Sequence, residues 1–136
     1  MFLLDTVVLS ETRKRNRDSG VLGWLSRQRD ADLYLSVVTI GEIERGIAQQ
    51  QSRNPDFAKT LSEWLDRVLT LYGDRILTVD LSTSRRWGAL SAELGNSGAD
   101  LLIAATALTH GLAVVTRNER HFQPTGVVVC NPFTGD

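Results

Sequence analysis

The fold is decided by residues 99–116, which read Ala99-Asp100-Leu101-Leu102-Ile103-Ala104-Ala105-Thr106-Ala107-Leu108-Thr109-His110-Gly111-Leu112-Ala113-Val114-Val115-Thr116. Residues 99–110 are apolar on nearly every side, which predicts a helix that is buried over most of its surface. Gly111 is the residue type that usually stands just beyond a helix C-terminus, and an apolar run typical of a strand follows it at once. A buried helix that leads directly into a strand indicates an α/β fold.

Four further apolar runs of the strand type occur along the chain, at residues 2–5, 33–38, 75–81 and 127–129. Most of these runs are too uniformly apolar for a strand with one face in water, so they suit a parallel sheet that is covered on both faces. The intervening segments predict helices. Asn54-Pro55 is a typical helix start, and Gly73 closes that helix. The alternation predicts a three-layer α/β/α sandwich with a mainly parallel central sheet.

Length and composition indicate one globular unit. The 136 residues, 42% hydrophobic and 23% charged, suit a single domain over residues 1–136. The one cysteine, Cys130, cannot form an intramolecular disulfide, which favours a reducing compartment. No apolar run approaches the roughly 20 residues of a membrane span, and the N-terminus lacks the basic segment of a signal peptide. We therefore expect a cytoplasmic protein that does not contact membranes.

The charge balance limits how this chain could bind nucleic acid. A formal net charge of −1 excludes binding by overall positive charge, but it does not exclude a local basic surface. Arginine-rich clusters occur at residues 13–17, 27–29, 85–86 and 117–120. Most of these side chains are expected to be solvated surface groups. The tryptophans could stack on bases, but their helical spacing beside leucines favours core packing; they are Trp24, Trp64 and Trp87.

Three carboxylates stand where strands end or helices begin in this pattern: Asp5, Glu42 and Asp100. Each has a purely structural interpretation, because Asp5 can cap a helix, and the other two follow Thr39 and Ser97 at the spacing of a capping box. In a parallel sheet, however, these positions can converge on one edge. Three converging carboxylates repel one another unless a divalent cation compensates them, and oxygen ligands suit Mg²⁺ or Mn²⁺. The set suggests metal-assisted hydrolysis of phosphodiester bonds.

Four motifs together resemble those of PIN-domain ribonucleases: Leu3-Leu4-Asp5-Thr6, then Leu35 to Ile43 with Arg45-Gly46-Ile47, then Ala99 to Ala107, then Val115-Thr116-Arg117-Asn118. The branch they resemble most is that of the VapC-type toxins of bacterial toxin–antitoxin pairs, including the FitB proteins. The resemblance spans nearly the whole chain and implies a small α/β/α nuclease that cuts RNA with Mg²⁺ or Mn²⁺. It also implies a homodimer, inhibition by a cognate VapB-like antitoxin, and contact with DNA only through that antitoxin.

The resemblance also assigns roles to individual residues. It implies that the catalytic acids are Asp5, Glu42 and Asp100. Asp5 and Asp100 would bind the metal directly, and Glu42 would complete the acidic pocket, directly or through water. Thr6 and Thr116 match polar positions that can orient an acid or a water.

The chain departs from the family pattern at two positions. Val7 stands where the family commonly has Asn, and His121 stands where it often has a fourth acid. Glu119, Asn118 and His121 are the residues that could take the place of that acid. A lone histidine is more often a surface or packing residue, so catalysis by His121 is not expected.

Two other classes of function compete with this interpretation. The first is a phosphotransferase or phosphatase with Asp5 as its nucleophile, but the haloacid-dehalogenase-like signature needs a second Asp where Val7 stands. The second is a PIN-like module that is catalytically weak or inactive and acts by binding a partner. Val7 and the missing fourth acid favour this second alternative.

Overall fold

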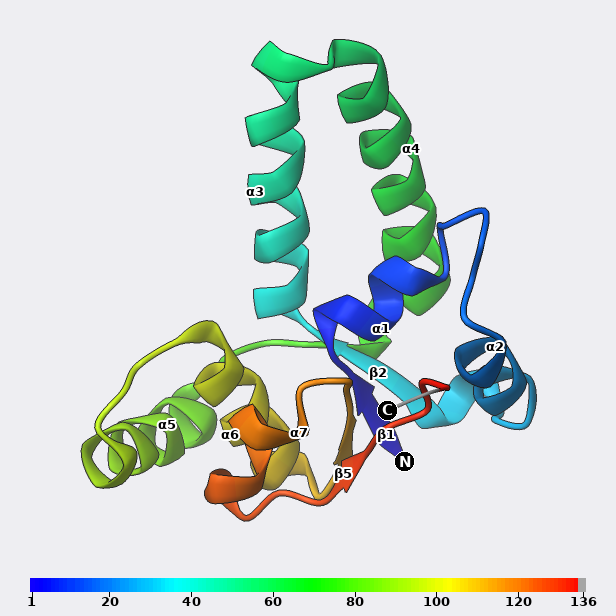
Figure 1. The fold of residues 1–136 in the computed structure, drawn as a ribbon. Coiled ribbons are helices and arrows are strands. Elements are labelled where there is room, and N and C mark those ends of the chain that lie inside the picture. The colour runs from blue at the N-terminus through cyan, green and yellow to red at the C-terminus, as the bar shows by residue number, and fades with distance from the viewer. Residues whose placement is uncertain (135–136) are drawn as a thin grey trace.

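The computed structural model describes residues 1–134 and shows a five-stranded sheet of order β3-β2-β1-β4-β5 (Figure 1). Every pair of neighbouring strands is parallel. The strands are β1 (Phe2–Leu4), β2 (Leu33–Ser36), β3 (Ile76–Leu77), β4 (Ala113–Val115) and β5 (Val129–Cys130). The predicted α/β/α fold with a parallel sheet is therefore confirmed.

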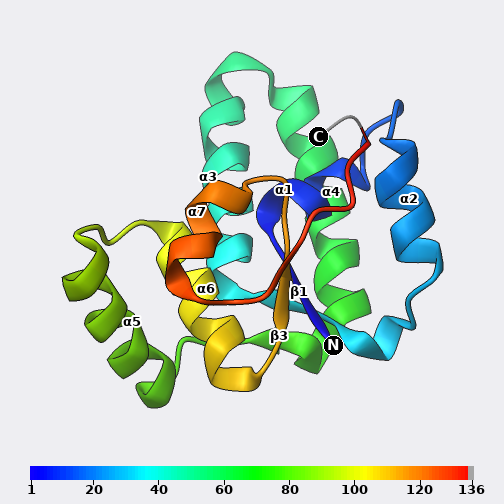
Figure 2. The ribbon, with the colours of Figure 1, turned by 60° about the horizontal axis from the view of Figure 1, so that its bottom comes forward.

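In the described residues, seven α-helices flank the sheet: α1 (Thr6–Glu11), α2 (Ser19–Ser26), α3 (Val37–Arg53), α4 (Pro55–Tyr72), α5 (Leu81–Leu94), α6 (Ala99–His110) and α7 (Glu119–Phe122). Helices α3 and α4 form a long hairpin that projects beyond the sheet (Figure 1). Figure 2 shows α5, α6 and α7 grouped together, with α2 and α4 on the other side of β1. In residues 1–134 no helix is long and apolar enough to span a membrane.

The central strand β1 divides the core into two clusters. Leu3 and Leu4 are both fully buried, and because successive strand residues point to opposite faces, they belong to different clusters. Leu4 packs with side chains of α1 to α4, whereas Leu3 packs with α6 and with Phe122 of α7. Both faces of the sheet are thus covered, as the uniformly apolar strand runs predicted.

The predicted helix boundaries around α4 and α6 are confirmed. The Asn54 side chain accepts a hydrogen bond from the Phe57 amide, and Pro55 follows it as the first helical residue. Gly73 ends α4 and Gly111 ends α6, both with a positive φ (50° and 68°) that favours glycine. The chain then enters β4 at Ala113, two residues beyond Gly111.

Every strand is shorter than the apolar run that predicted it or is shifted along the chain, and three runs differ most from the structure. The run 33–38 stops being a strand at Ser36, whose hydroxyl accepts a hydrogen bond from the Val38 amide and so begins helix α3. Only Ile76–Leu77 of the run 75–81 pairs with β2. The last strand is Val129–Cys130 rather than residues 127–129, because its register is set by pairing with β4.

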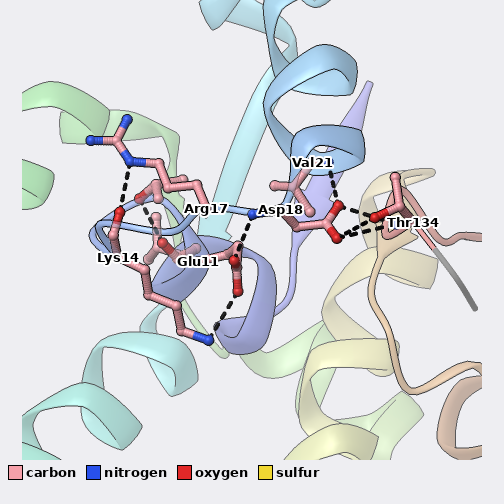
Figure 3. Close-up of polar contacts among 8 residues, drawn as sticks. Glu11, Lys14, Arg17, Asp18, Val21 and Thr134 are labelled. Carbon is pink, nitrogen blue, oxygen red and sulfur yellow. Dashed lines mark hydrogen bonds and ion pairs between the residues drawn. The ribbon is translucent and has the colours of Figure 1, made fainter.

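The loop between α1 and α2 is organised by one buried carboxylate. Glu11 is 5% exposed, accepts a hydrogen bond from the Asp18 amide at 2.8 Å, and pairs with the Lys14 ammonium at 3.0 Å (Figure 3). The Asp18 amide and the Lys14 ammonium together hold the pKa of Glu11 below its ordinary value. Glu11 thus stabilises the fold in its ionised form.

We expect Glu11→Gln to lower the free energy of unfolding by about 1 kcal/mol at about pH 7, because the charge-assisted contacts are lost. A carboxyl whose pKa is lowered by folding stabilises above its unfolded pKa, and that stabilisation is lost as the pH falls through the folded value. The difference between wild type and variant should therefore shrink at acidic pH. Urea unfolding at about pH 7 and about pH 4 measures it. A difference that stays constant between the two pH values would contradict this role, and exposed Glu44→Gln is the matched control.

Candidate active site

Asp5 lies at the edge of the sheet where β1 ends and α1 begins. Its Oδ1 accepts a hydrogen bond from the Thr6 amide at 2.8 Å, and its Oδ2 accepts one from the Thr116 hydroxyl at 2.8 Å. Thr116 directly follows β4, and β4 pairs with β1 through Leu4 and Val115, so the two strand ends are adjacent. Asp5 is only 2% exposed. The predicted helix cap and the predicted strand-end position are both confirmed at Asp5.

The surroundings of Asp5 raise the pKa of its carboxyl. Burial raises the pKa of its carboxyl above the ordinary value, although the hydrogen bonds from Thr116 and Thr6 oppose this shift. The negative charges of Asp100 and Glu42 add to the rise.

Glu42 reaches this edge from helix α3. Its Oε1 accepts a hydrogen bond from the Thr6 hydroxyl at 2.6 Å, and the Thr39 hydroxyl lies 3.0 Å from the same Thr6 oxygen. The capping-box interpretation of Thr39 and Glu42 was wrong, because α3 begins one turn earlier, with Ser36 as its cap. Glu42 thus lies in the second turn of α3, where it meets Thr6 instead of a backbone amide.

Asp100 is the second residue of α6. The cap of α6 is Gly98, which has no side chain to offer, so the capping box predicted between Ser97 and Asp100 is wrong as well. Asp100 instead turns to α7, where its Oδ2 lies 2.8 Å from Nδ1 of His121. Nothing in the sequence analysis anticipated this contact.

An open cavity of about 560 Å³ joins these elements. Its lining includes Glu42 from α3, Asp100 from α6, and Arg120 and His121 from α7. Arg120 supplies a cation beside two carboxylates. The arrangement thus presents acids and one arginine to solvent in the same hollow, which suits a phosphate-bearing substrate whose charge must be both bound and balanced.

Comparison with known proteins identifies the family to which this site belongs. The sequence profile of the PIN domain matches residues 2–126. The chain belongs to the PIN-domain family. It is 37% identical over 140 aligned positions to the VapC ribonuclease Y4jK of Sinorhizobium fredii, covering 98% of both chains. It is 34% identical over 139 positions to toxin FitB of Neisseria gonorrhoeae, covering 98% of this chain and 99% of FitB.

A solved structure of FitAB bound to an IR36 DNA fragment has the same fold as this PIN domain. The match has a TM-score of 0.86 at 32% identity and covers 100% of this chain and 98% of the other. The family resemblance and the PIN-like fold predicted from the sequence are therefore confirmed.

The structure separates the three residues that could replace the fourth acid in this PIN domain. The Glu119 carboxylate accepts a hydrogen bond from the Asn131 side chain at 3.2 Å, and it is not part of the cavity lining. Asn118 uses its backbone amide to donate to the Thr116 hydroxyl at 2.9 Å. His121 alone of the three contacts Asp100. His121 was already a candidate from the sequence, because it stands where the family often has a fourth acid.

The donors of this PIN domain match a hard divalent cation in chemistry, but they are spread apart. Among residues 1–134, no group of three or more His, Cys, Asp or Glu side chains is close enough to hold a metal ion on its own. Burial is the main cause of the raised Asp5 pKa, and repulsion from Asp100 and Glu42 adds to it. A cation between the carboxylates would relieve that repulsion. Carboxylate oxygens with room for water or phosphate oxygens suit Mg²⁺ better than a softer metal.

Proposed function

We propose that this PIN domain, acting as one unit over residues 1–136, is a metal-dependent endoribonuclease toxin that a VapB-like antitoxin neutralises. The observation that carries the proposal is the placement of the three acids. Thr6 contacts both Asp5 and Glu42, and Glu42 and Asp100 line the same open cavity. These acids occur in a chain that matches a VapC ribonuclease and the toxin FitB over their whole lengths. A toxin that cuts cellular RNA acts where that RNA is present, in the cytoplasm.

The chemistry follows from what each residue holds. Asp5 and Asp100 would bind Mg²⁺ or Mn²⁺ directly, with Glu42 completing the acidic pocket. A divalent cation there would lower the pKa of a water and offset the charge that builds on the phosphate. Thr116 and Thr6 hold the Asp5 carboxylate in place from both sides.

Arg120 is the cationic partner of these acids. It lines the cavity beside Asp100 and Glu42 and can hold a phosphate oxygen of the RNA through its guanidinium. The carboxylates would then act in cleavage, and the arginine would act in binding the RNA.

Cleavage of total cellular RNA by the purified, antitoxin-free protein tests the proposal. We expect fragments in the presence of Mg²⁺ or Mn²⁺ and none from double-stranded DNA, and sequencing of the fragment ends identifies the target. Folded protein that binds RNA but cuts none with either metal would leave the binding module as the better account. The contact of His121 with Asp100, which occupies one carboxylate oxygen, is the observation that favours that second candidate.

The antitoxin is expected to bind along an apolar groove. A cavity of about 420 Å³ between α1 and α4 is lined by Leu9, Val68 and Leu71 among others. Leu71 is 62% exposed, so an amphipathic segment of a partner could cover it. The FitAB complex is bound to a DNA fragment in its solved structure, and for this chain we expect contact with DNA only through the antitoxin.

A homodimer stays a prediction for this chain. Its support is two exposed apolar side chains, Leu22 on α2 and Leu69 on α4. Light scattering at micromolar concentration measures the mass, and a monomer would contradict the prediction.

We expect His121→Asp to lower the metal concentration that gives half-maximal cleavage several-fold, because a further carboxylate next to Asp100 adds an oxygen ligand. Titration of Mn²⁺ in the cleavage assay measures this midpoint. Glu119→Asp is the control on the same helix, since its carboxylate is outside the cavity. An unchanged midpoint in His121→Asp would show that this position does not reach the metal.

A further inference from the structure

A second cavity lies between the loop after α1 and helix α4, and its lining is strongly basic. Its volume is about 550 Å³, and its cations are Arg13, Lys14, Arg15, Arg17 and Arg67. We refer to this cavity as the basic groove. It contains five of the 15 Lys and Arg side chains of a chain whose net charge is −1. Among the described residues no acidic side chain lines it, so its charge is concentrated locally.

Two aromatic side chains of α4 lie among these cations. Phe57 and Trp64 both line the basic groove and are half-buried, and both also pack against the core. The Arg13 guanidinium lies over the Phe57 ring at 5.4 Å from its centroid. Cations interleaved with aromatic rings are typical of surfaces that bind single-stranded nucleic acid, where phosphates pair with the cations and bases stack on the rings.

The loop that carries the cations is held in one conformation. The Arg17 Nε donates a hydrogen bond to the Lys14 carbonyl at 2.9 Å (Figure 3). The Glu11 carboxylate ties Lys14 to the Asp18 amide, and Asp18 is in turn held by the Thr134 hydroxyl at 2.6 Å. A loop that is already ordered loses little conformational freedom when it binds a ligand. This favours binding by the loop as a preorganised site.

The basic groove and the acidic site lie at opposite ends of one short helix. Asp5 caps the N-terminus of α1, and the loop with Arg13 follows its C-terminus. Helix α1 has six residues, which corresponds to about 9 Å at 1.5 Å per residue. An RNA strand with one phosphate at the carboxylates can therefore reach the basic groove within a few nucleotides.

Given the ribonuclease activity proposed for this PIN domain, we propose that the basic groove binds the backbone of single-stranded RNA next to the cleavage site. Arg13, Arg15, Arg17 and Arg67 pair with phosphates, while Phe57 and Trp64 offer stacking surfaces. The aromatic rings favour RNA over an acidic peptide, because a peptide carboxylate needs the cations alone. Lys14 contributes less, since Glu11 already neutralises it.

Binding of a fluorescein-labelled 20-nucleotide single-stranded RNA, measured by anisotropy in chelator, tests the groove without any cleavage. The protein is the full chain carrying Asp100→Asn, with and without the triple change Arg13→Gln, Arg15→Gln and Arg17→Gln. We expect the triple variant to bind about tenfold or more weakly, and the slope of log Kd against log salt to fall by about 2. Arg67→Gln should lower the slope by about 0.7. Because Arg67 lies on α4 and not on the loop, this variant distinguishes lost phosphate contacts from a misfolded loop.

The matched control removes three exposed arginines elsewhere, by Arg27→Gln, Arg85→Gln and Arg86→Gln. An equal loss of RNA affinity in this control would overturn the groove in favour of unspecific charge. Unchanged RNA affinity and slope in the triple variant would overturn the proposal too. If the triple variant loses affinity for a Glu-rich 20-residue peptide but keeps its affinity for RNA, the groove belongs to an acidic partner instead. If the wild type cuts no RNA with Mn²⁺ while the groove variants still lose RNA affinity, the ribonuclease proposal fails and the groove stands.

Discussion

Replacing Asp100 by Asn removes the metal-dependent cleavage of RNA, with an expected loss of at least about a hundredfold in rate. The reason is that Asp100 is proposed to bind the cation directly, and a bound cation contributes several kcal/mol of transition-state stabilisation. Each 1.36 kcal/mol corresponds to about a tenfold change in rate. Asp5→Asn is expected to have the same effect. Initial rates on a defined RNA at saturating Mn²⁺ measure both.

The control for this loss is Glu44→Gln, which neutralises an exposed carboxylate two residues beyond Glu42 on the same helix. It should cut RNA at the wild-type rate. Circular dichroism of each variant separates lost chemistry from lost structure. If folded Asp100→Asn kept the wild-type rate, the acids would have no catalytic role and the assignment of the site would be wrong.

Phe122→Ala is expected to lower the free energy of unfolding by about 3–5 kcal/mol, the range for truncating a buried aromatic ring. Phe122 is the largest fully buried side chain, at 0% exposure, and it packs beneath the sheet with Leu3 and Ile103. It anchors the short helix α7, which carries Arg120 and His121 to the cavity. Urea unfolding measures the loss.

Phe122→Leu is the matched control, because it keeps an apolar side chain at the same site. It should cost roughly half as much, since fewer buried atoms are removed. A loss below about 1 kcal/mol for Phe122→Ala would show that α7 is held to the domain by other contacts.

The layered fold could be predicted because its signals are local. Asn54-Pro55, Gly73 and Gly111 fix helix ends through backbone chemistry that needs no tertiary context. The strand lengths could not be predicted in the same way. Ser36 redirects the chain into α3 although Val37 and Val38 have the composition of a strand, because a side-chain hydrogen bond outweighs a weak propensity.

The site shows the same division. Asp5 follows β1 and Glu42 lies in the helix that follows β2, so the parallel strands bring these two acids to one edge, as the alternation of strands and helices predicted. Asp100 reaches the cavity that Glu42 lines, but from α6, which follows another helix. The partners of each acid could not be inferred, because hydrogen bonds between Thr6 and Glu42, or between His121 and Asp100, join residues 36 and 21 positions apart. The capping boxes failed for a related reason, since both helices begin at other residues than the spacing suggested.

Metal dependence is tested most directly by following RNA cleavage by one sample of wild-type protein, first in chelator and then after excess Mn²⁺ is added. We expect intact RNA in the first phase and cleavage that begins on addition of the metal, with Asp5→Asn inactive in both phases. Cleavage that proceeds unchanged in chelator, or folded protein that stays inactive after the metal is added, would contradict a metal-dependent ribonuclease built on these three carboxylates.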